Sequence, residues 1–179
     1  NLVLMTKLLK FNNTFTKAPE SFGTNFNFRI KNKNGGILKY YGSFDTNRLG
    51  LQNESLEPET DFDNTSLKGK NTFHNISYRQ KLGRYLVNLG SSYTFNNNLI
   101  DLNNTYQESE FNLNSIDITG NYFNAKGTLE RKINKISAIR GGIEFNQTRE
   151  NTDVAISPVP YSFNDRITSV FAETDLGFS

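Results

Sequence analysis

The stretch from Arg84 to Asn98, RYLVNLGSSYTFNNN, alternates between apolar and polar side chains. Five of its apolar residues share one parity: Tyr85, Val87, Leu89, Tyr93 and Phe95. Because successive side chains of a strand point to opposite faces, the pattern predicts a strand with one apolar and one hydrated face. Either a protein core or lipid can cover the apolar face, so a soluble sheet and a membrane barrel both remain open.

The same alternation recurs in TNFNFRIK, LKYYGSF, YFNAKGTLER, AIRGGIEFN and SVFAETDLGF. The apolar parities of these segments begin at Phe26, Leu38, Phe123, Ile139 and Val170. The opposite parity holds ions, among them Arg29, Lys126, Glu130, Arg140, Glu144 and Glu173, and its clear exception is Phe171. No segment is apolar on both faces and no helical period appears, so a sheet covered by helices is not expected.

The connections between these segments alternate in length. Short ones with turn residues are Lys31–Gly36, Gln80–Arg84 and Arg131–Lys135, and long polar ones span about residues 46–70, 96–115 and 149–164. Short turns on one side, long extracellular loops on the other and strands of alternating polarity are typical of outer-membrane barrels. The sequence therefore predicts an all-β antiparallel meander that forms part of a transmembrane barrel.

Composition and charge narrow the possible functions. The 179 residues have a net charge of +2, so nothing favours nucleic-acid binding, and with no cysteine and one histidine, His74, a thiolate or multi-histidine metal site is excluded. Glu144 and Glu173 allow a carboxylate pair, but Arg29, Lys126 and Arg140 favour ion pairs on a hydrated face instead. The glycine pairs Gly35–Gly36 and Gly141–Gly142 indicate a turn and a strand bend or bulge, not a phosphate loop. We expect that the protein is not an enzyme and that it binds no cofactor.

One acidic stretch, ESLEPETDFDNTS, is the candidate ligand site. Its carboxylates are Glu57, Glu59, Asp61 and Asp63. The alternation of Asp61, Asp63 and Thr65 is similar to the start of a calcium loop, but the glycine and terminal glutamate of that loop are misplaced. Two interpretations remain: a solvated extracellular loop, or a cation or ligand contact at the barrel mouth.

Three segments, KNKNGGILKYYGSF, SYRQKLGRYLVNLGSSYTFNNNLID and DRITSVFAETDLGFS, resemble the barrel of TonB-dependent outer-membrane receptors, particularly the Bacteroidetes type. In that family a Phe-Ala-Glu strand with a following acidic residue comes after a long extracellular loop. Phe171, Ala172, Glu173 and Asp175 occupy these positions here. The resemblance extends over essentially the whole chain.

The resemblance implies a barrel of roughly 22 strands around a plug. It also implies energised uptake of a nutrient such as a metal chelate, cofactor or glycan, through an inner-membrane energy-coupling protein. These 179 residues would then be an internal part of the barrel wall without the plug or the closing strands, in contact with the lipid bilayer and an unknown small ligand. The alternatives are a small non-energised barrel of porin or adhesin type, and a soluble β-sheet module that binds carbohydrate.

Overall fold

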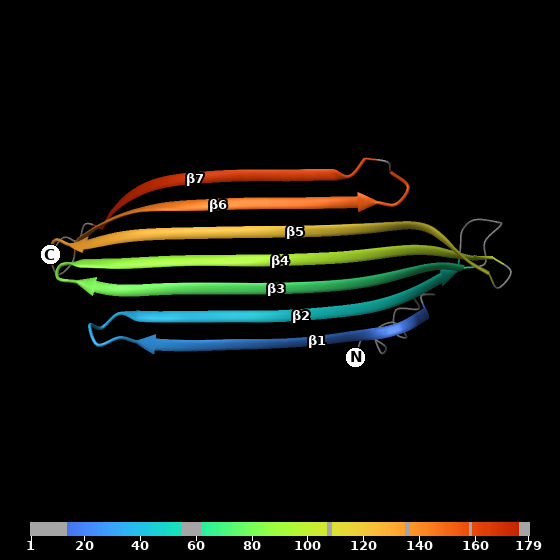
Figure 1. Cartoon of the computed structure of the whole chain (residues 1–179), viewed down its shortest axis with the longest axis horizontal. Coiled ribbons are helices and arrows are strands. Elements are labelled where there is room, and N and C mark those ends of the chain that lie inside the picture. The colour runs from blue at the N-terminus through green and yellow to red at the C-terminus, as the bar shows by residue number, and fades with distance from the viewer. Residues whose placement is uncertain (1–13, 55–61, 107–108, 135–136, 158, 176–179) are drawn as a thin grey trace.

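The computed structural model describes residues 14–54, 62–106, 109–134, 137–157 and 159–175, which form a single antiparallel sheet (Figure 1). The strands are β1 Thr14–Lys31, β2 Ile37–Glu54, β3 Phe62–Leu82, β4 Tyr85–Tyr106, β5 Ser109–Lys132, β6 Ala138–Val154 and β7 Tyr161–Asp175. Their order in space is their order in sequence. The predicted all-β meander is confirmed. No helix in these ranges is long and apolar enough to cross a membrane.

The three predicted short turns all lie at one end of the sheet, on the left of Figure 1. In the β1–β2 turn the Asn32 side chain accepts a hydrogen bond from the backbone of Gly36 at 2.5 Å, and Gly35 has a φ of +79°. Gly83 has a φ of +60° in the two-residue connection from β3 to β4. A positive φ is disfavoured for side chains with a Cβ, so glycine suits both positions.

The connections at the opposite end are shorter than the sequence suggested. Residues 46–54 and 62–70, 96–106 and 109–115, and 149–154 and 161–164 all lie within strands. The expected loop bounds were therefore too wide. In these strand ends, the positions that are apolar in the rest of each strand carry polar residues. The alternation that indicates a strand is therefore missing, and the sequence pattern is that of a loop.

Pro19 also lies within a strand. It falls in β1, within the register shift between Lys17 and Glu20. Proline lacks the N–H that a strand needs on its paired side, and it is tolerated where the pairing is irregular.

The strand register places all the predicted apolar parities on one face. Phe28 pairs with Tyr40, Tyr40 with Ile76, and Leu89 with Gly127, which in turn pairs with Ile143. Directly paired residues share a face, so the alternation read from each segment adds up to a single continuous surface. The other parity, which includes Arg29, Lys126 and Arg140, forms the opposite surface.

The polar surface is the concave side of the sheet, because its side chains in the first half of β4 are less exposed than those of the opposite parity. A hollow of about 620 Å³ reaches across it between the hairpins, with Gly35, Arg79, Leu86, Glu130 and Ile133 in its lining. A second hollow of about 340 Å³ includes Asn88, Lys126 and Phe171. We call this surface the concave face, and the surface that bears Phe28, Tyr40 and Phe95 the convex face.

The convex face is exposed. Leu89 is 52% exposed although its strand lies in the middle of the sheet, and Val170 is 80% exposed. Among the described residues no hydrophobic side chain is buried. A soluble sheet of this size buries its apolar face against a second layer, and the described residues provide none.

Candidate functional site

Aromatic side chains dominate the first strands of the convex face. The rings of Phe28 and Tyr40 stack with centroids 5.3 Å apart, and the Phe26 ring lies 5.8 Å from that of Phe28. His74, the single histidine, joins this group: its Nδ1 lies 2.7 Å from the Tyr40 hydroxyl. This contact agrees with the structural role that a lone histidine suggests.

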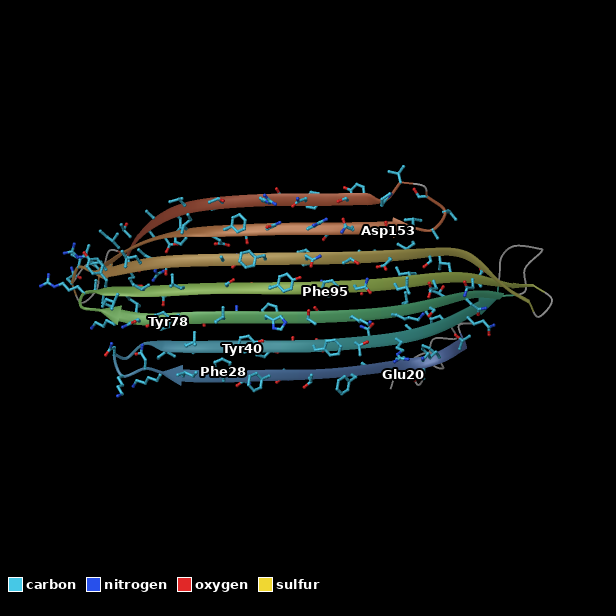
Figure 2. The ribbon with its side chains drawn as sticks, in the orientation of Figure 1. Glu20, Phe28, Tyr40, Tyr78, Phe95 and Asp153 are labelled. Atoms are coloured by element: carbon cyan, nitrogen blue, oxygen red, sulfur yellow. The ribbon has the colours of Figure 1, made fainter. Side chains whose placement is uncertain are left out.

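The apolar part of the convex face ends along a definite line toward the loop side. The last residues before the face becomes polar are Phe22, Phe44, Phe95, Phe123, Phe145 and Val170, in β1, β2, β4, β5, β6 and β7. Figure 2 shows Phe28, Tyr40 and Phe95 along the sheet, with Glu20 and Asp153 closer to the loop side. Beyond the line, the described residues of β2 to β7 on this face are polar or glycine, apart from Leu99.

The line crosses the sheet diagonally. Residue pairing connects Phe22 through Thr46, Lys70, Asn97, Thr119 and Asn151 to Ser162 on β7. The boundary residue on β7 is Val170, which lies eight residues beyond Ser162 toward the hairpins. The hairpin turns are displaced in the same direction. The β1–β2 turn ends beside Ile37, which pairs with Arg79 on β3. The β3–β4 turn begins three residues further along β3, after Leu82. The apolar region is therefore a slanted band.

Beyond the band the two faces exchange polarity. On the convex side, Lys68 forms an ion pair with Asp101 at 3.2 Å, and Ser115 donates a hydrogen bond to the same carboxylate. On the concave side, four half-buried aliphatic residues form one row across β3 to β6: Leu67, Ile100, Ile116 and Val154. The environment of the sheet therefore changes at the slanted line.

Charged residues on the concave face form ion pairs across strands. Arg140 on β6 contacts Glu130 on β5 at 2.8 Å and Glu173 on β7 at 3.2 Å. Lys126 contacts Glu144 at 3.1 Å. Glu144 and Glu173 therefore have separate cationic partners and do not form a carboxylate pair. This agrees with the ion pairing that the sequence favoured. Arg29 makes no ion pair with the described residues.

Phe171, the apolar exception on the polar parity, has a specific place here. Its ring lies below the Lys126 ammonium, with 4.9 Å between the nitrogen and the ring centroid. A Cβ on Gly142 would lie 2.6 Å from the Phe171 ring, so the missing side chain makes room for it. The register through Gly141 and Gly142 is unbroken, so the alternative of a β-bulge there is wrong.

Uncharged polar side chains continue this network toward the loop side. Asn124 donates to Asn146 at 2.6 Å and to Glu144 at 3.2 Å, and the Tyr122 hydroxyl donates to Glu150. Sequence reasoning did not single out Tyr122 or Glu150, because the signal is only their shared parity. Together these groups give a hydrated, hydrogen-bonding surface and no nucleophile or general acid–base pair.

The acidic ligand-site candidates are mostly outside the described residues: Glu57, Glu59 and Asp61 lie there. Asp63 is described, and it is half-buried near the loop-side end of β3, paired with Asn53 and Asn104. No metal-binding group of three or more histidine or acidic residues occurs in the part of the chain that the structure describes. Ligand binding by this stretch stays a prediction.

The chain is similar in structure to three transport proteins of known structure. It aligns with the ferric yersiniabactin uptake receptor FyuA from Yersinia pestis at a TM-score of 0.59 and 8% identity, over 86% of this chain and 24% of that one. For the copper transporter OprC the TM-score is 0.69 at 9% identity, over 94% and 29%. For the unliganded ferric citrate transporter FecA it is 0.64 at 10% identity, over 87% and 25%.

The chain spans less than a third of the length of each of these proteins. No protein-family model and no curated sequence matches it. At such low identity the likeness shows the fold alone. The seven strands form an antiparallel meander that matches part of the barrel of outer-membrane TonB-dependent receptors.

Proposed function

We propose that the chain is part of the barrel wall of a TonB-dependent receptor in a bacterial outer membrane. The convex face contacts lipid and the concave face lines the water-filled interior. The whole protein takes up a scarce nutrient such as a metal chelate, cofactor or glycan, and is energised through an inner-membrane coupling protein. The fold, the exposed apolar face and the paired charges on the opposite face all support this proposal.

The slanted band is the observation that supports it best. A shift of eight residues is about 27 Å along a strand, and six strand spacings are about 29 Å, which gives an angle of roughly 43°. Strands of outer-membrane barrels tilt by about 35–45° from the membrane normal, so a horizontal membrane edge must cross them at this slant. In a soluble sheet no membrane boundary crosses the strands, so such a slanted edge is not expected.

The height of the band agrees with the same geometry. On β4 the band runs from Tyr85 to Phe95, ten residue steps or about 34 Å along the strand. At a tilt of about 40° this distance corresponds to a vertical height of about 26 Å, close to the roughly 25 Å apolar band of such barrels. The slant and the height come from different residues, and both match a bilayer.

Single-cysteine labelling tests the proposal. The 179 residues contain no cysteine, so one introduced thiol is unique within them. In the intact protein in native membranes, we expect a spin label at Leu89→Cys to be relaxed by oxygen, which concentrates in lipid. A label at Ser92→Cys, three residues along the same strand, should respond to a water-soluble nickel chelate instead.

The opposite accessibility, or water exposure at both positions, would contradict the membrane assignment. The transport step needs a separate measurement, because a passive barrel would give the same labelling. Uptake that stops when the inner-membrane coupling protein is deleted distinguishes an energised receptor from a non-energised pore. The Bacteroidetes type and the nutrient itself remain predictions.

A further inference from the structure

A hollow of about 330 Å³ lies on the convex face, apart from the charged network of the concave face. Its lining consists of Tyr93, Asn121, Phe123, Gln147, Arg149 and Asn151, from β4, β5 and β6. The register places these residues together: Tyr93 pairs with Phe123 and Phe123 with Gln147, while Asn121 pairs with Arg149. The hollow is therefore built from adjacent side chains of one surface.

The hollow lies across the edge of the slanted band. Phe123 is the last apolar residue of β5 before that edge, and Tyr93 is its partner on β4. Phe123 and Tyr93 are 38% and 40% exposed, so their rings form an apolar floor. The amides and Arg149 lie on the polar side of the edge. A molecule bound here would contact apolar and polar groups at opposite ends.

Hydrogen bonding leaves donors available in the hollow. The Tyr93 hydroxyl donates to Oδ1 of Asn121 at 2.7 Å, which occupies the acceptor of that amide. Nδ2 of Asn121 makes no hydrogen bond with another described side chain, and neither does the Gln147 amide. Both amides line the hollow together with Arg149, so its polar side offers several donors.

Two arginine residues, Arg149 and Arg166, lie on adjacent strands at this edge. Arg166 on β7 pairs with Gln147, and it is therefore the diagonal neighbour of Arg149, with Cα atoms about 7–8 Å apart. Both side chains are exposed, and neither forms an ion pair with the described residues. Their sequence neighbours Glu150 and Asp165 lie on the concave face, because adjacent residues of a strand point to opposite sides. Glu150 accepts its hydrogen bond from Tyr122 there.

We propose that this hollow binds the phosphorylated headgroup of a membrane lipid in the leaflet on the loop side. Arg149 and Arg166 bind the phosphate, since guanidinium forks match phosphate oxygens. Asn121 and Gln147 donate to further headgroup oxygens, and the acyl chain lies over Tyr93 and Phe123. The inference rests on the proposed membrane location, because only that location brings a lipid headgroup to the edge of the band.

The test compares two double variants of the intact protein by native mass spectrometry in mild detergent. Arg149→Gln/Arg166→Gln removes the guanidinium that lines the hollow and the one diagonal to it on β7. The control, Arg29→Gln/Lys39→Gln, removes two neighbouring charges from the concave face, where these residues pair directly. The probes are phosphatidylglycerol, diacylglycerol without phosphate, and inorganic phosphate as a competitor.

We expect the wild type and the control to retain one bound phosphatidylglycerol and the first variant to bind it about 30-fold more weakly, since each basic group contributes about fivefold. Diacylglycerol should not be retained. Equal retention by both variants would overturn the proposal. So would displacement of the lipid by millimolar inorganic phosphate, which indicates a free-anion site, or loss of a dimer without any change in lipid binding, which indicates contact between two copies.

Two checks keep the result interpretable. Circular dichroism of each variant confirms that the strands have formed, and glutamine at exposed positions should not prevent this. The spin label at Leu89 is read separately, in native membranes. If Leu89 lies in lipid and no headgroup is retained, only this inference fails. If Leu89 does not lie in lipid, the proposed membrane location fails first.

Discussion

Gly142 and Phe171 depend on each other, as a small residue and a large one that share the same space. A methyl group at Gly142 would meet the Phe171 ring at 2.6 Å and the Gly127 carbonyl oxygen at 2.7 Å. The backbone oxygen cannot move away without disturbing the β5–β6 pairing. The sequence showed the aromatic exception and the two glycines, but only the register connects them, because β6 and β7 place them side by side.

We expect Gly142→Ala to destabilise the protein by about 1–3 kcal/mol, the usual cost of overpacking. Equilibrium urea unfolding of the intact protein in lipid vesicles, followed by circular dichroism, measures this. The matched control is Gly141→Ala, where a new methyl group would meet only the Phe171 carbonyl oxygen at 3.7 Å. A Gly142 variant as stable as the Gly141 variant would show that the ring moves freely.

Arg140 differs from Lys126 in how its charge is shared. It contacts two carboxylates, and one of them, Glu130, is only 13% exposed. Lys126 makes a single pair with the more exposed Glu144. Removing a shared cation leaves two carboxylates, on the strands on either side, without that partner, whereas exposed single pairs contribute little.

Arg140→Met should therefore lower the free energy of unfolding by about 1 kcal/mol more than Lys126→Met. Both variants are compared with the wild type by urea unfolding at low and at high salt. The difference between them should shrink as salt screens the remaining Glu130–Glu173 repulsion. Equal losses in both variants would mean that the second carboxylate contact of Arg140 contributes nothing.

At the scale of elements, the strands were predictable where each has one environment on each face. From Phe26 to Ile30 and from Tyr85 to Phe95 the alternation gives the correct face and the approximate extent. The strand ends beyond the band were not predictable. There the convex side is polar and aliphatic residues such as Leu67 and Ile100 move to the concave side, so the parity reverses within one strand. In the sequence, this reversal of polarity is indistinguishable from the end of a strand.

The hairpins were predictable because their glycines are local signals. We expect Gly83→Ala to cost about 1 kcal/mol, since alanine resists a φ of +60°. The neighbouring substitution Arg84→Ala serves as the control and should have little effect on unfolding. If Gly83→Ala leaves stability unchanged, the turn can adopt another backbone conformation at no cost.

The candidate site was less predictable than the sheet. The acidic stretch attracted attention by composition, and most of it lies outside the described residues. The ion pairs were inferred in kind from Lys126, Arg140 and the glutamates of the same parity. The exact partners required the register, and so did the hollow near Arg149, whose residues come from three strands and share no motif.

For the molecule as a whole, the slanted band predicts where a charge is tolerated. Leu89 lies near the middle of the band, so Leu89→Arg should destabilise the protein in vesicles by about 2–4 kcal/mol. Thr46 lies on the same face just beyond the edge, and Thr46→Arg should cost about 0–1 kcal/mol. Unfolding in vesicles of uniform lipid measures both. Similar costs at the two positions would remove the reason for assigning the band to a bilayer.

Because the strands are tilted, the position of a residue along a strand determines its depth in the membrane. Two residues along a strand are about 6.7 Å apart, which at a tilt of about 40° is a vertical step of about 5 Å. Neighbouring strands sample depths between these steps, because each is displaced relative to the last. A series of probes on the convex face would therefore act as a ruler, and could report how bilayer thickness around the protein changes with the length of the lipid chains.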